Sequence, residues 1–158
     1  LAAQLGLPYA FASHFAPAAL DEAFELYRHL FKPSSQLTQP YAMPCISVVV
    51  ADTDEQADYL FSSMQQRFLG MIRNKRGKLL PPIDNMESCW SPMEKVQVES
   101  MLTCAFVGSA ATVKDKLQHF INRTQADELM VSAGIFEQSA RLHSYKLLAD
   151  IGQQLVYA

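Results

Sequence analysis

Several features that would assign a function at once are absent from the 158 residues. No apolar run approaches the roughly 18 residues that a membrane-spanning helix needs, so no membrane partner is predicted. Walker, zinc-ligand and Gly-x-Gly-x-x-Gly spacings are missing, and the four histidines do not cluster, so no metal site is predicted. A net charge of −3 gives no bulk attraction to nucleic acid, so no nucleic-acid partner is predicted.

Cysteine is scarce, and its spacing excludes a disulfide scaffold. Cys45, Cys89 and Cys104 are odd in number, lie far apart and form no Cys-x-x-Cys pair. Such thiols are typical of a reducing compartment, so a cytoplasmic location is predicted. A chain that is 49% hydrophobic and 18% charged is not disordered. It predicts a single domain with a buried core over residues 1–158.

The most informative stretch covers residues 9–15, which are aromatic or small and carry no acidic or basic group before His14. It predicts a β-strand buried on both faces, as in a parallel sheet that helices cover. Ser13 and His14 stand at the C-terminal end of this strand, where α/β proteins place their functional groups. They are therefore the candidate site residues. A structural role for His14 is an equally good interpretation, because side chains alternate inward and outward along a strand.

Residues 45–50 and 128–133 predict two further strands of the same apolar kind, so about three parallel strands are expected in one sheet. Amphipathic helices are predicted between and after them, which is typical of βα units and of an α/β fold with helices on one face of the sheet. Helical spacing is clearest at Leu20, Phe24, Tyr27 and Phe31, at Ala57, Leu60, Met64 and Phe68, and at Leu142, Tyr145, Leu148 and Ile151.

Two segments have both a structural and a functional interpretation. The basic run at residues 74–78, followed by paired prolines, is typical of a solvated turn, and a long loop of this kind is also typical of a mobile lid beside a cleft. Gly108 and Ser109 open a helix and are typical of an ordinary cap. The backbone N–H groups at such a helix start can also hold an anion.

Four segments of the chain carry a recognisable pattern. They are Leu1–Pro8 with the strand that follows, Ile46–Thr53, Phe106–Val113 and Ala126–Val131. Together they resemble the bacterial luciferase-like, flavin-dependent monooxygenase family, and their order and spacing agree with it over nearly the whole chain. Phe106–Val113 is similar to the family's Val-Gly-Ser/Thr-Pro-x-x-Val segment, with Ala110 where the family often has proline.

The resemblance implies that the chain is the C-terminal portion of a TIM (β/α)8 barrel, since a complete barrel needs about 250 residues. It implies a parent enzyme that uses reduced flavin mononucleotide (FMN), or a related deazaflavin, and oxygen on a small organic substrate. A flavin reductase is left open as a partner. Much of the family's phosphate-binding site and its proton-handling residues would lie upstream of Leu1. No catalytic residue is therefore assigned, and the isolated chain is expected to be inactive and to bind flavin weakly or not at all.

The resemblance also assigns positions in the site. Ser13 and His14 are predicted to form a flavin-binding wall, and Phe11 to face the substrate cavity. Open strand edges predict self-association, so a homo-oligomer is expected. Two alternatives stay open: a non-catalytic flavin-binding or structural relative of the family, and an unrelated phosphate-binding barrel enzyme that uses Gly108 and Ser109.

Overall fold

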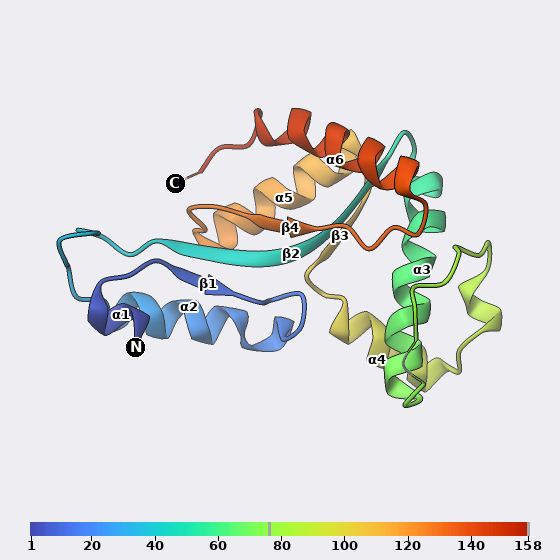
Figure 1. Ribbon diagram of the computed structural model, residues 1–158, viewed down its shortest axis with the longest axis horizontal. Coiled ribbons are helices and arrows are strands. Elements are labelled where there is room, and N and C mark those ends of the chain that lie inside the picture. The colour runs from blue at the N-terminus through green and yellow to red at the C-terminus, as the bar shows by residue number, and fades with distance from the viewer. Residues whose placement is uncertain (76, 158) are drawn as a thin grey trace.

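The fold is organised around one long central strand, β2 (Ala42–Ala51), to which all three other strands pair in parallel (Figure 1). The computed structural model describes residues 1–75 and 77–157. β1 (Tyr9–Phe11) lies beside the first residues of β2, and β3 (Ala105–Ser109) lies beside its last five. β4 (Met130–Ser132) pairs with the middle of β2. The predicted parallel α/β sheet is therefore confirmed.

Helices connect the strands, and two short 3-10 turns lie at Pro17–Ala19 and Met86–Ser88. The prediction of about three strands missed β3, because its short Ala-Phe-Val-Gly-Ser sequence reads as the link between two helices. The helices are α1 (Ala2–Leu5), α2 (Leu20–His29), α3 (Asp54–Ile72), α4 (Pro92–Met101), α5 (Ala110–Thr124) and α6 (Gln138–Gly152).

Side chains of β2 alternate between two faces that have different surroundings. Ile46, Val48 and Val50 are buried in a core shared with α2, α5 and the end of α6; we call this the helix-covered face. The opposite face, which we call the cleft face, carries Ser47 and, further along, Val49. Val49 packs with residues of α3, so α3 covers only the C-terminal end of the cleft face. Helices therefore lie on both faces, not on one as predicted.

The predicted helix faces are confirmed in α2 and only partly in α6. Leu20, Phe24 and Tyr27 of α2 are all buried. In α6, Ile151 is buried, but Leu142 and Tyr145 are 59% and 40% exposed. The expectation that these two residues face inward was wrong, because α6 packs mainly through its C-terminal half and Ser144, whose Oγ accepts a hydrogen bond from Val50 N–H.

The turn from β3 into α5 is joined to the start of α3 by the Asp54 carboxylate. Asp54 Oδ1 accepts a hydrogen bond from Ser109 N–H at 2.6 Å, and Oδ2 accepts one from Thr112 Oγ1 at 3.1 Å. Gly108 makes this approach feasible, since a Cβ there would lie 2.8 Å from Asp54 Oδ1 and 2.7 Å from Thr112 Cγ2. Its φ of +148° also lies in a region that favours glycine.

Replacing Gly108 should therefore destabilise the fold. We expect Gly108→Ala to lower the free energy of unfolding by about 1–3 kcal/mol, because the new Cβ meets two fixed groups in an unfavourable backbone conformation. Urea unfolding followed by circular dichroism measures the change. Gly152→Ala is the matched control, since a Cβ at Gly152 meets nothing within 4 Å. Equal stability of the two variants would contradict this account of the turn.

Candidate functional site

A cleft of about 780 Å³ lies where β1 and β4 end against the middle of β2, beside α3 and the loop that follows it. The strands contribute polar or small groups to it: His14 just after β1, Ser47 on β2, and Ser132 and Gly134 at the end of β4. Met64 and Phe68 of α3 add an apolar wall. The carboxyl ends of parallel barrel strands are where TIM-barrel enzymes bind their ligands, so this cleft is the candidate site.

His14 is held at the cleft by one carbonyl group of β2. The Cys45 carbonyl accepts hydrogen bonds from Ser13 Oγ at 2.6 Å and from His14 N–H at 2.9 Å. His14 Nδ1 lies 3.2 Å from the same oxygen, a contact in which Nδ1 carries the proton and donates. In that tautomer Nε2 is an acceptor, and no partner of Nε2 occurs in the described part of the chain. His14 thus offers the cleft one oriented acceptor.

The three predicted site residues lie in different environments. His14 lines the cleft, and its ring lies 4.1 Å from that of Phe15, measured between centroids. Ser13 is fully buried, and its hydroxyl is used on the Cys45 carbonyl, so it positions the neighbouring histidine. Phe11 packs at the core on the helix-covered face, 6.3 Å from the Tyr9 ring, and is not among the residues that line the cleft. Its place in a substrate cavity stays a prediction.

Among the lining residues that were not proposed from the sequence are two serines, Ser47 and Ser132. Ser132 had a signal, because it follows an apolar run near the end of a predicted strand. Ser47 had none, because it is the one hydroxyl inside the apolar strand β2, and only the alternation of faces places it toward the cleft.

The proposed anion site at Gly108 and Ser109 is occupied by a group of the protein itself. Ser109 N–H donates to Asp54, and this bond is the main cause that lowers the pKa of the Asp54 carboxyl below its usual value. An incoming phosphate would have to displace this carboxylate. The structure therefore favours the ordinary-cap interpretation, in which Ser109 Oγ accepts from Thr112 N–H.

The segment after α3 borders the cleft, as the lid interpretation expects. Lys75, Lys78 and Leu80 line the cleft, while Ile83 N–H donates to Ser62 Oγ at 2.8 Å and Met86 is buried. Arg76, which belongs to the predicted basic run, lies outside the described residues. The mobility of the segment stays a prediction.

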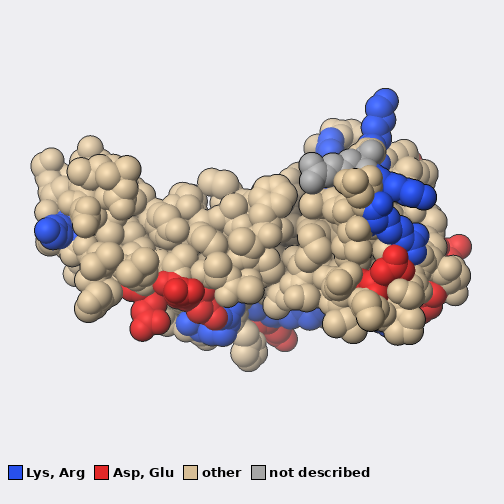
Figure 2. Space-filling model, turned by 90° about the horizontal axis from the view of Figure 1, so that it is seen from below, with Lys and Arg blue, Asp and Glu red and all other residues tan. Residues whose placement is uncertain are grey.

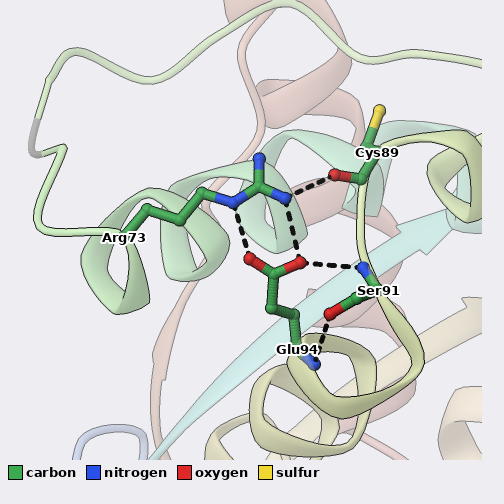
Figure 3. A network of polar contacts seen from close by, with 4 residues as sticks. All are labelled: Arg73, Cys89, Ser91 and Glu94. Atoms are coloured by element: carbon green, nitrogen blue, oxygen red, sulfur yellow. Dashed lines mark hydrogen bonds and ion pairs between the residues drawn. The ribbon is translucent and has the colours of Figure 1, made fainter.

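A polar network joins the two ends of this segment (Figure 3). Arg73, just after α3, donates from Nε and Nη2 to the two carboxylate oxygens of Glu94 at 2.7 and 2.9 Å, and from Nη2 to the Cys89 carbonyl at 2.8 Å. Glu94 also accepts from Ser91 N–H, and Ser91 Oγ caps α4 in return. The end of α3 and the start of α4 are thereby fixed together beside the cleft.

This network predicts a pH dependence of stability. Hydrogen bonds from Arg73, followed by that from Ser91 N–H, lower the pKa of Glu94 from 4.5 to about 2. A carboxyl whose pKa is lower in the folded state stabilises the fold fully above its unfolded pKa, and this contribution disappears as the pH falls toward 2. The stability difference between the parent protein and Glu94→Gln should be largest at neutral pH and shrink below about pH 4.5.

Urea unfolding at pH 7, 4 and 3 measures that difference. Glu99→Gln on the same helix is the control, since Glu99 forms no ion pair in the described part of the chain. A difference between the parent and Glu94→Gln that stays constant over this pH range would contradict the assignment of a lowered pKa to Glu94.

Comparison with known proteins finds relatives over nearly the whole length of this chain, although no family model matches it. The luciferase-like monooxygenase of Escherichia coli (strain K12) is 50% identical over 156 residues, which is 99% of this chain and 47% of that protein. The protein YvbT of Bacillus subtilis (strain 168) is 46% identical over 96% of this chain and 45% of its own length. The resemblance to the luciferase-like monooxygenases is confirmed.

Solved structures agree with this relationship. Apo-MsnO8 has a TM-score of 0.76 at 28% identity, over 99% of this chain and 48% of that chain. The oxygenating constituent of 3,6-diketocamphane monooxygenase from Pseudomonas putida, solved in complex with FMN, has a TM-score of 0.58 at 16% identity, over 96% and 43% of the two chains. The latter shows the fold alone. The chain thus has part of a TIM-barrel fold and spans about half the length of the relatives it matches.

The described residues show two further properties that bear on function. Within residues 1–75 and 77–157, no group of three or more His, Cys, Asp or Glu side chains is arranged to hold a metal ion. None of the described helices combines the length and the apolarity needed to cross a bilayer.

Proposed function

We propose that this chain forms the C-terminal part of a flavin-dependent monooxygenase that uses reduced FMN and oxygen on a small organic substrate. The main supporting observation is the cleft at the carboxyl ends of β1 and β4, beside Ser47 of β2, in a chain that is 50% identical to a luciferase-like monooxygenase. An FMN complex of a protein with the same fold supports the choice of cofactor. The three free cysteines support a cytoplasmic location.

The cleft residues fit one side of a flat, partly polar ring system. Gly134 has no side chain, and a Cβ there would lie 2.4 Å from Met64 Cε, so Met64 already packs against the backbone of Gly134. His14 presents an acceptor, and Ser132 a hydroxyl whose 3.5 Å contact with the Ile46 carbonyl is long. Met64 and Phe68 of α3 add apolar lining, which would help to keep water out. The flavin would carry the oxygen chemistry, while these residues bind, orient and keep the site dry.

The rest of the proposed barrel would cover the exposed part of the cleft face. Cys45 of β2 is only partly buried, and Met130 of β4 is 46% exposed, although both belong to strands of the central sheet. Apolar side chains in such positions are normally buried by further strands. We propose that the same exposed sheet leads the isolated chain to self-associate and to bind flavin weakly or not at all.

His14→Ala in the full-length gene product should weaken FMN binding roughly two- to tenfold, because one oriented hydrogen-bond acceptor is lost. Quenching of FMN fluorescence measures the dissociation constant. His29→Ala, an exposed histidine of α2, is the control and should leave it unchanged. Unchanged FMN affinity in His14→Ala would remove His14 from the flavin wall.

The activity itself is tested by oxygen consumption. The full-length product, supplied with reduced FMN and a panel of small organic substrates, should consume oxygen faster with at least one substrate than without any. Flavin binding with no substrate-dependent oxygen consumption would instead identify a non-catalytic flavin-binding relative. Absence of any flavin binding would contradict the proposal.

A further inference from the structure

The cleft has a strong charge asymmetry that the proposed reaction does not require. Its described lining includes four cationic side chains and no Asp or Glu, in a chain whose net charge is −3. The cationic lining residues are Arg67, Arg73, Lys75 and Lys78. Figure 2 shows Lys and Arg gathered at the end of the molecule that holds α3 and α4, beside the hollow in its outline.

Three of these cations form no ion pair within the residues that the structure describes. Arg73 pairs with Glu94, 2.7 Å away, whereas none of the ion pairs in that part of the chain involves Arg67, Lys75 or Lys78. Cations near a helix C-terminus are favoured by the helix dipole, which accounts for Lys75 in part. Arg67 lies more than one turn before the end of α3, where this effect has decayed, so the dipole does not explain the whole group.

The local backbone conformation places Lys75 beside the cleft. Asn74 has a φ of +55°, and Lys75 N–H donates to the Gly70 carbonyl at 2.7 Å, so the chain folds back at the end of α3. A Cβ at Gly70 would lie 2.8 Å from the Lys75 carbonyl oxygen, which shows how close the return is. The position of the basic side chains beside the cleft is thus a property of the local fold.

Much of the remaining lining of the cleft is apolar. Phe68 and Leu69 of α3, Leu80 of the following loop and Phe15 beyond β1 all contribute to it. A ligand that matches both the cationic and the apolar lining residues has an anionic head and an apolar body. We infer that the cleft binds such an organic anion, with Arg67, Lys75 and Lys78 around the head group. This deepens the proposed function, because it states the charge of the ligand of the same site.

The anionic head has two chemically similar sources: the phosphate of a flavin nucleotide, or a sulfonate or carboxylate on the organic substrate. Two pairs of probes separate them. FMN and riboflavin differ by the phosphate, and octane-1-sulfonate and octan-1-ol differ by the anionic head. Isothermal titration calorimetry on the full-length product gives the dissociation constant of each probe at low and high salt.

The test variant is the double substitution Lys75→Gln and Lys78→Gln. The matched control is Lys32→Gln with Lys146→Gln, which removes the same charge from exposed positions outside the cleft. The test variant should weaken binding of the anionic member of one pair about fivefold, and less at high salt, while the neutral member is unaffected. Loss confined to FMN identifies the flavin phosphate as the source. Loss confined to octane-1-sulfonate identifies the substrate head.

The inference is overturned if both anionic probes bind the test variant as tightly as the parent protein, or if the control variant loses as much affinity as the test variant. These readouts are equilibrium affinities, so they stand whether or not oxygen is consumed. If no substrate increases oxygen consumption but the anionic probe still binds through the lysines, the monooxygenase proposal is rejected and the anion-binding inference is supported.

Discussion

The hydrogen bonds along β2 are the constraint on which the rest of the structure depends. This one strand of ten residues pairs with β1, β3 and β4, so the sheet does not exist without it. Its alternation divides the molecule into the helix-covered face and the cleft face. The Cys45 carbonyl accepts from Ser13 and from His14, and thereby sets the histidine at the cleft. Packing and site geometry thus derive from the same backbone.

The second organising element is the joint between α3 and its neighbours. At its start, the Asp54 carboxylate holds the turn that opens α5, and at its end Arg73 is bound to Glu94 and to the carbonyl of Cys89. Between these joints α3 presents apolar and basic side chains to the cleft. A helix fixed at both ends supports a rigid wall, which is what a site that orients a cofactor and a substrate requires.

Local patterns in the sequence were sufficient for most of the fold. The apolar run around residues 45–50 and the helical spacing at Leu20, Phe24 and Tyr27 needed no tertiary information, because burial on both faces of a strand and on one face of a helix leave direct signals. β3 was not predicted, because five residues between two helices show little periodicity. The exposed Leu142 shows that an amphipathic pattern gives a helix but not how much of it is covered. The resemblance supplied the family, which no composition or spacing could have given.

One part of the site had a direct signal in the sequence. His14 is a polar residue at the end of an apolar strand and lines the cleft, whereas Phe11 packs at the core on the helix-covered face and its place in a substrate cavity stays a prediction. Which face a strand residue occupies depends on register with β2, and that is a long-range property. The occupation of the Ser109 N–H by Asp54 is likewise set by residues 55 positions apart in the sequence.

The most direct test of the central claim, that the carboxyl ends of β1 and β4 beside β2 form the ligand site, is a crystal structure of the full-length gene product with FMN. The account predicts that the flavin ring lies in the cleft, in contact with His14 and with the end of β4. A flavin bound on the helix-covered face, or in the barrel without touching these residues, would contradict it.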